Sequence, residues 1–284
     1  MNRRIPRLAA LLVALPVVLF SASVPSAVAR PAHAAPVAPH LPLTDVPFAR
    51  SQSGLAYDEV RNATVMFGGE YIGAYMNDTW RWDGTKWKLL APRRSPSARA
   101  GMGMAFDAAT GQIVMFGGFT GQVYLNDTWV WTGRSWRRMR VPTRPSPRAN
   151  MGMTYDAARQ VVVMFGGGTF NIFNDTWTWD GTTWTKQSPA ASPAKRSDMG
   201  MAYDQARQLV VMFGGQGFNL LGDTWTWDGT NWTEQTPSSS PRSRWGPGLG
   251  YDIVNQSVAL FGGETAGGPL GDTWTWDGTN WTQR

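Results

Sequence analysis

The sequence predicts an all-β protein, a β-propeller of five four-stranded antiparallel blades, from three observations. Double glycines recur at 68–69, 117–118, 166–167, 214–215 and 262–263. An Asp-Thr-Trp tripeptide begins at 78, 127, 175, 223 and 272. No segment beyond residue 50 has the 3.6-residue apolar period of a helix. Repeats of nearly 50 residues that contain only strands are typical of radial β-architectures.

The third repeat shows the four expected strands most clearly. Strand a is the alternating run 151–155, and Asp156 after it suits a turn. Strand b is the apolar run 161–165, which indicates burial on both faces. Strand c follows the b–c loop and alternates with period two, so that two of its tryptophans share one face. An Asp-Gly hairpin signal at 180–181 then leads into strand d.

The boundaries follow from this pattern. Residues 1–29 have a basic start, an apolar run and small residues at the end, which are typical of a secretory signal peptide, with cleavage as late as residue 35 as an alternative. The Pro- and Ala-rich stretch 30–49 is expected to be a tether. The propeller is expected over 50–284, in blades at about 50–95, 96–144, 145–193, 194–241 and 242–284. We therefore expect a secreted or cell-envelope protein with no membrane span after cleavage.

An apolar run that ends in Gly-Gly and is followed by two spaced tryptophans resembles the kelch repeat. The runs lie at 65–69, 113–118, 163–167, 211–215 and 259–263. The resemblance is to the kelch β-propellers of the galactose-oxidase central-domain type, in a secreted bacterial form. It implies a binding platform or one of several unrelated enzymes, because such folds carry many functions.

Two features depart from that family. Kelch propellers usually have six or seven blades, and many split one blade between the two termini. Here five blades are each built from contiguous chain. A closed five-bladed ring is the simplest interpretation, and an incomplete ring that assembles with another chain is the alternative.

Fifteen of the 16 tryptophans occupy three repeated positions, and we expect them to pack between blades. Trp245 is the exception, because the other copies have Ser or Ala at its position. It is a candidate ligand contact, with packing beside the junction of blades 5 and 1 as the alternative.

One arginine precedes the strand-a turn by eight residues in every copy, namely Arg50, Arg99, Arg148, Arg196 and Arg244. Clustered at one rim, these side chains would bind an acidic ligand through bidentate hydrogen bonds. The alternative is that each pairs with the Asp of an Asp-Thr-Trp tripeptide, namely Asp78, Asp127, Asp175, Asp223 or Asp272.

The b–c loops vary between copies, and variable loops are where binding residues are expected. They carry aromatic side chains beside amides, which favours a protein or glycan ligand. The candidate contacts are Tyr71, Tyr75, Tyr124, Phe170, Phe173 and Phe218.

Glu70 and Glu264 give the alternative function, a carbohydrate-active enzyme. Each follows a Gly-Gly pair, and two carboxylates on one rim could perform glycosidase chemistry. The kelch resemblance also allows an activity like that of the sialic-acid epimerases. The copper-radical oxidases of kelch-like fold need a Cys–Tyr crosslink and His ligands, so the composition of the repeats excludes that activity. The chain has no Cys, and its two His precede the repeats.

Binding is favoured over catalysis, and no cofactor or metal is expected. Removal of the leader with Arg3, Arg4 and Arg7 lowers the formal net charge from +6 to +3. That charge is too small and too dispersed to favour nucleic acid. The expected partner is a protein or glycan on one propeller face, with oligomerisation if the ring does not close.

Overall fold

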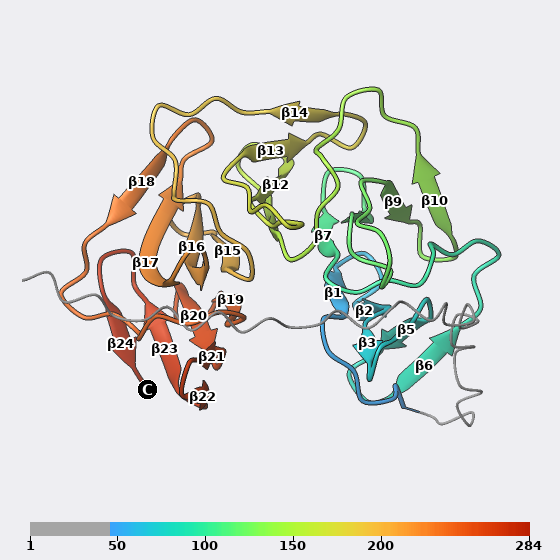
Figure 1. The fold of residues 1–284 in the computed structure, drawn as a ribbon, viewed down its shortest axis with the longest axis horizontal. Coiled ribbons are helices and arrows are strands. Elements are labelled where there is room, and N and C mark those ends of the chain that lie inside the picture. The colour runs from blue at the N-terminus through green and yellow to red at the C-terminus, as the bar shows by residue number, and fades with distance from the viewer. Residues whose placement is uncertain (1–45) are drawn as a thin grey trace, which may run out of the picture. The chain divides into compact units, whose positions relative to one another are not determined.

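The computed structural model describes residues 46–284, in which every helix or strand assigned is a β-strand. The predicted signal peptide and most of the predicted tether lie outside these residues. Five four-stranded sheets follow one another around a common axis, from the first repeat to the fifth (Figure 1). The sequence-based prediction of a five-bladed, all-β propeller is therefore confirmed.

Each blade contains four antiparallel strands that pair in chain order. The strands of the first blade are β1 (Gly54–Asp58), β2 (Ala63–Phe67), β5 (Thr79–Trp82) and β6 (Trp87–Leu90). The second blade contains β7 (Gly103–Asp107), β8 (Gln112–Phe116), β9 (Thr128–Trp131) and β10 (Trp136–Met139). The third contains β11 (Gly152–Asp156), β12 (Val161–Phe165), β13 (Thr176–Trp179) and β14 (Trp184–Lys186).

The fourth blade contains β15 (Gly200–Asp204), β16 (Leu209–Gln216), β17 (Leu220–Trp227) and β18 (Trp232–Gln235). The fifth contains β19 (Gly248–Asp252), β20 (Ser257–Phe261), β23 (Thr273–Trp276) and β24 (Trp281–Gln283). Two small ribbons stand in b–c loops, β3 (Glu70–Tyr71) with β4 (Ala74–Tyr75), and β21 (Glu264–Thr265) with β22 (Gly268–Pro269).

Strand b forms the centre of each blade. In β12, the side chains of Val162 through Phe165 are fully buried, as the unbroken apolar run predicts. The following Gly166 and Gly167 have φ angles of 62° and 77°, which non-glycine residues rarely adopt. A Cβ on Gly166 would also lie 2.4 Å from the backbone oxygen of Arg196 in the next blade. The Gly-Gly pair therefore ends the strand and lets the next blade approach.

Tryptophans of strand d join each blade to the one before it. The Trp184 indole donates a hydrogen bond of 2.9 Å to the Thr128 hydroxyl in β9, and its ring meets Phe116 edge-on at 5.3 Å. The same bond joins Trp136 to Thr79, Trp232 to Thr176 and Trp281 to Thr224. The predicted role of these indoles in blade-to-blade packing is confirmed.

A ladder of backbone hydrogen bonds links the blades near the axis. The amides of Gly101, Asn150, Asp198 and Gly246 each donate to the carbonyl of the equivalent residue in the preceding blade, beginning at Gln52. All five residues have φ between 54° and 65°, so the ladder repeats one left-handed backbone conformation. The ladder has four steps among the described residues, and no fifth step joins Gly246 to Gln52.

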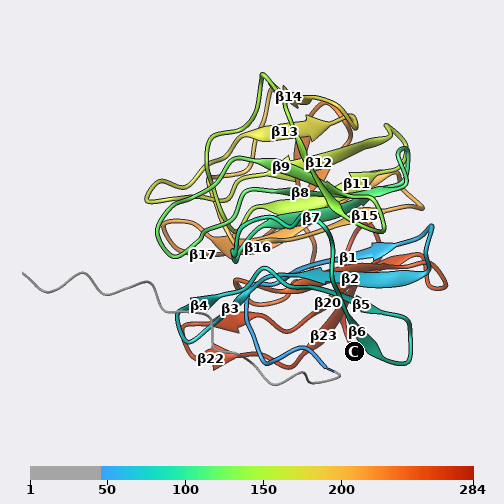
Figure 2. The ribbon, with the colours of Figure 1, turned by 90° about the vertical axis from the view of Figure 1, so that its right-hand side faces the viewer.

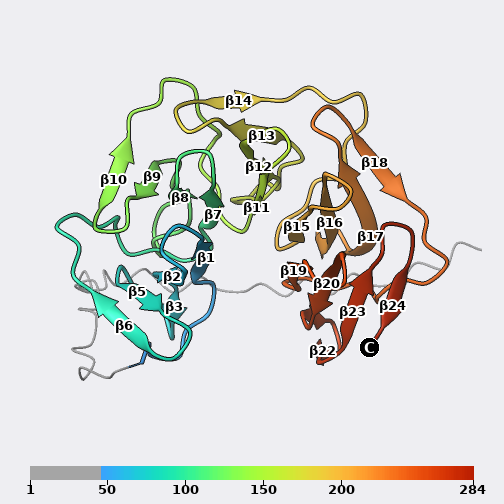
Figure 3. The ribbon, with the colours of Figure 1, turned by 180° about the vertical axis from the view of Figure 1, so that it is seen from behind.

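The first and fifth blades do not pack on each other as the other neighbours do. Strand-a contacts join β1 to β7, β7 to β11, β11 to β15 and β15 to β19, and no comparable contact joins β19 to β1. Figures 1 and 3 show these two blades separated on either side of an opening, and Figure 2 shows them from the side. Of the two expectations for closure, the structure has the incomplete ring.

Candidate functional site

Each predicted arginine belongs to a cluster inside its own blade. The Arg148 guanidinium binds both carboxylate oxygens of Asp175, with Nη1–Oδ1 and Nη2–Oδ2 distances of 2.5 and 2.9 Å. It also donates to the backbone oxygens of Ser146 and Gly166. The Trp177 indole donates to the same Asp175 carboxylate at 2.8 Å. The arginine therefore fastens strand a to the start of strand c.

The same pairing occurs in all five blades, as Arg50–Asp78, Arg99–Asp127, Arg148–Asp175, Arg196–Asp223 and Arg244–Asp272. The arginine side chains are at most 4% exposed, so they offer a ligand almost no accessible surface. Hydrogen bonds from Arg244 lower the pKa of Asp272 to about 2. The pairing alternative is confirmed, and the arginines stabilise the blades rather than form an open anion-binding rim.

On the face formed by the b–c loops, the tips of four successive loops carry the most exposed apolar side chains. Ile72, Val123, Phe170 and Phe218 have exposed fractions of 83%, 55%, 97% and 95%. Phe170 and Phe218 were singled out from the sequence, and Ile72 and Val123 were not. Ile72 and Val123 share one signal with the other two, because each stands near the middle of its loop.

Aromatic rings form a continuous row across the first three blades and end at the Phe170 tip. Tyr75 contacts Phe119 at a centroid distance of 5.8 Å, Phe119 contacts Tyr124 at 4.6 Å, and Tyr124 contacts Phe170 at 6.1 Å. We call Tyr75, Phe119, Tyr124 and Phe170 the aromatic row. Burial raises the pKa of the Tyr75 hydroxyl, and the nearby Glu70 carboxylate adds to the effect.

The remaining loop candidates lie outside this row. Tyr71 packs edge-on against Phe48 at 4.7 Å. Phe173 lies beneath the Arg148 guanidinium, 4.0 Å from the ring centroid to Cζ, so it supports the arginine cluster. Trp245 is half-buried, and its backbone exchanges two hydrogen bonds with Glu264.

Glu70 and Glu264 stand on the two blades that do not pack on each other. β3 and β21, which begin with them, lie on opposite sides of the opening (Figure 1). The Glu70 carboxylate accepts hydrogen bonds from the Gly73 amide and the Ser51 hydroxyl, so it caps its own loop. Nothing in this arrangement supports a catalytic pair, and the carbohydrate-active alternative has no structural support.

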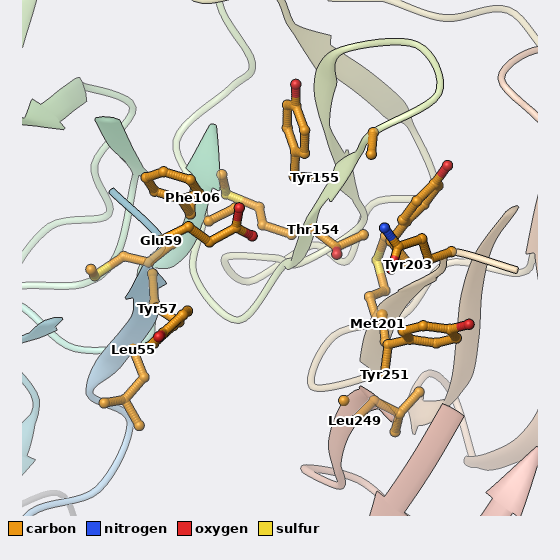
Figure 4. A pocket seen from close by; sticks show the side chains of 18 residues that line it. Leu55, Tyr57, Glu59, Phe106, Thr154, Tyr155, Met201, Tyr203, Leu249 and Tyr251 are labelled. Atoms are coloured by element: carbon orange, nitrogen blue, oxygen red, sulfur yellow. The ribbon is translucent and has the colours of Figure 1, made fainter. Parts of the chain in front are cut away.

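The five strands a surround a central channel. We call the end of the channel at the turns between strands a and b the a–b mouth. A cavity of about 470 Å³ at this mouth is lined by one aromatic residue from each blade (Figure 4). These residues are Tyr57, Phe106, Tyr155, Tyr203 and Tyr251. These five residues were not predicted from the sequence, although each directly precedes the turn Asp of its repeat.

Part of this aromatic ring is occupied in joining blades. The hydroxyls of Tyr203 and Tyr251 accept hydrogen bonds from the amides of Ala158 and Ala206 in the preceding blades, at 3.0 and 3.1 Å. Burial raises the pKa of Tyr155 and Tyr203, and nearby carboxylates add to the effect. Tyr57 has no preceding blade and bonds instead to Asn62 in its own turn. The a–b mouth is thus ringed by aromatic side chains, with Glu59, Thr154 and Gln205 among its polar lining residues.

At the other mouth, Asp198 is the acidic residue of the axis ladder. It lines a cavity of about 200 Å³ with Gln52 and Asn150. Burial raises its pKa, and hydrogen bonds with Ser197 and Asn150 only partly offset this effect. This residue was not predicted from the sequence.

Among the described residues no group of three or more His, Asp or Glu side chains is placed to hold a metal ion. No helix in this part of the chain is long and apolar enough to cross a membrane.

Comparison with known proteins identifies a family. The sequence model of the KLHDC2/KLHL20/DRC7 Kelch-repeats domain matches residues 39–191, more than half of the chain. The matched region contains the first three blades, from β1 to β14. No curated protein matches the chain.

Proposed function

Because the chain belongs to the Kelch-repeat family, we propose that it is a protein-binding platform whose partner docks on the face formed by the b–c loops. The observation that supports this face most strongly is the set of four apolar loop tips. Ile72, Val123, Phe170 and Phe218 are more than half exposed on successive blades. An exposed apolar surface of this kind is typical of an interaction site.

The chemistry of the tips favours a protein over a glycan. Ile72 and Val123 are aliphatic and offer no flat ring on which a sugar could stack. The aromatic row lies beside them, so a partner that inserts apolar side chains between the tips would bury both kinds of surface. Aromatic anchors commonly dominate the binding energy of such interfaces.

The proposal is tested by selecting peptides from a random displayed library against the full chain. We expect peptides rich in apolar residues, and we expect the double variant Phe170→Ser, Phe218→Ser to bind them about 30-fold more weakly or worse, since an anchor residue typically contributes 2 kcal/mol or more. Titration calorimetry measures the loss.

Ile253→Ser is the matched control, because Ile253 is an apolar side chain, 69% exposed, in an a–b turn. It should bind the selected peptides as tightly as the wild type. Equal binding by the double variant would remove the b–c tips from the proposal. Binding to a glycan array in place of peptides would change the class of partner.

We also propose that the platform is exported. This rests on the basic, apolar and small-residue pattern of residues 1–29, which lie outside the described residues. N-terminal sequencing of the mature protein should begin at Arg30, or a few residues later if the second Ala-x-Ala site is cleaved. A mature protein that retains Met1 would contradict export with cleavage.

A further inference from the structure

The outer face of the fifth blade has the residues of an internal blade junction without their partners. Phe67, Phe116, Phe165 and Phe213 directly precede the Gly-Gly pair in the first four blades and are fully buried. Each is covered by the strand-d tryptophan of the following blade. Phe261 ends strand b in the fifth blade and is 61% exposed.

The polar groups of this junction are equally unpartnered. The Thr224 hydroxyl in β17 accepts a hydrogen bond from the Trp281 indole, whereas the equivalent Thr273 receives none from any described residue. The Gly215 amide donates to the Arg244 carbonyl at 2.8 Å, and the equivalent Gly263 amide has no such acceptor in the described chain.

The glycines of strand a show how closely a neighbour fits this face. A Cβ on Gly103 or Gly152 would lie 2.2 Å from a methionine sulfur of the next blade, and one on Gly200 would lie 2.3 Å from Leu249. A Cβ on Gly248 would approach no side chain of residues 46–284 and would lie 3.8 Å from the Phe261 oxygen. The fifth blade therefore keeps the space that a sixth strand a would need.

The first blade presents the complementary half of the junction. Two tryptophans flank the turn between strands c and d in every blade. They are at most 2% exposed in the other four blades, whereas Trp82 and Trp87 of the first blade are only half-buried. Leu55 occupies the position of the side chains that cover a preceding glycine, and it is 54% exposed. Tyr57 is 49% exposed for the same reason.

We propose that the two open edges form a docking site for a partner polypeptide that carries a four-stranded unit of this same repeat. The partner's strand-d tryptophan covers Phe261 and donates a hydrogen bond to Thr273, and its strand a packs on Gly248. Its own strand b then receives Trp87. The four internal junctions define this chemistry, because each is built from the same residue types in the same order.

A second copy of the chain does not fit the same opening. Its first blade would occupy the next position around the axis, but four more blades would follow it. The four existing junctions already turn the chain through most of a circle (Figures 1 and 3). If they stayed in the plane of the ring, those blades would overlap the first copy. If they rose out of the plane, the contact would form an open head-to-tail assembly that breaks the axis ladder.

The test adds the missing unit to the full chain. Residue Gln235 occupies the repeat position of Arg284, so a second copy of residues 236–284 placed after Arg284 continues the array in register. A second variant carries the same unit through a long Gly/Ser linker, which imitates a separate partner at high local concentration. Hydrogen exchange at Gly263 and at strand β20 reports docking.

We expect exchange at Gly263 to slow at least tenfold in both extended chains, to a rate near that of Gly215. Phe261→Ser in the fifth blade should restore fast exchange, and Phe218→Ser should not, because Phe218 lies on a b–c tip. The two variants also separate this proposal from the loop platform, since each leaves the other surface intact.

Three results would overturn the proposal. The added units could leave exchange at Gly263 unchanged. The unmodified monomer could already protect Gly263 and Trp87, which would mean that blades 1 and 5 close on each other. Light scattering could show a dimer of the unmodified chain that Phe261→Ser dissociates, which would make the occupant a second copy.

Discussion

At the residue scale, Asp198 is held in a place that disfavours its charge. It is half-buried at the b–c mouth of the channel, and burial raises its pKa. A carboxyl group with a raised pKa in the folded state stabilises the fold most when it is protonated. Its contribution is lost as the pH rises from the unfolded pKa through the higher folded pKa.

We therefore expect Asp198→Asn to raise the free energy of unfolding at pH 7 by on the order of 1 kcal/mol. Asn also suits the left-handed backbone here, because Asn150 holds the equivalent position in the third blade. Urea unfolding at pH 4 and pH 7 measures the effect. The gain should shrink at pH 4, and an equal gain at both pH values would contradict the ionisation argument.

At the scale of the element, strand a depends on glycine only where another blade lies over it. Gly103 meets Met153 of the third blade, and Gly248 meets no side chain. Gly103→Ala should therefore destabilise the protein by about 1–3 kcal/mol through overpacking. Gly248→Ala should change stability by less than about 0.5 kcal/mol or raise it slightly. Thermal unfolding of the two variants side by side tests this contrast, and equal losses would contradict it.

The same elements show what the sequence could predict. The strands and turns were predictable because strand-b runs, Gly-Gly pairs and Asp-Gly hairpins act locally. From the sequence, the pairing of Arg148 with Asp175 was one of two alternatives, because it depends on how strands a and c are brought together. The open edge was harder still. Phe261 and Phe213 occupy the same repeat position, yet one is exposed and the other buried.

Of the candidate site, the sequence predicted the loops but not the roles within them. Phe170 and Phe218 are exposed as a binding surface requires, whereas Phe173 supports Arg148 from below. All three are phenylalanines in equivalent loops, so residue type could not separate them. The role of each ring is decided by neighbours that are distant in sequence, as Arg148 is from Phe173.

At the scale of the whole molecule, stability should depend on junctions between neighbouring blades, as in other repeat proteins. Trp184 is 1% exposed and donates its indole N–H to Thr128, whereas Trp87 is half-buried with no such bond to a described residue. Trp184→Phe should cost about 2 kcal/mol, because it removes buried area and leaves the Thr128 hydroxyl unpaired. Trp87→Phe should cost less than half as much. Urea denaturation followed by circular dichroism compares them, and equal costs would mean that the first blade has a neighbour in solution.

The methionines of the channel expose the molecule to one kind of chemical damage. Six methionines line the channel, namely Met102, Met104, Met151, Met153, Met199 and Met201. Their sulfurs lie in pairs beside strand-a glycines of the preceding blades. Conversion to the sulfoxide adds an oxygen and a dipole to each sulfur. The added oxygen would crowd the glycine backbone of the neighbouring blade, so we expect peroxide to loosen several junctions at once from the inside of the channel.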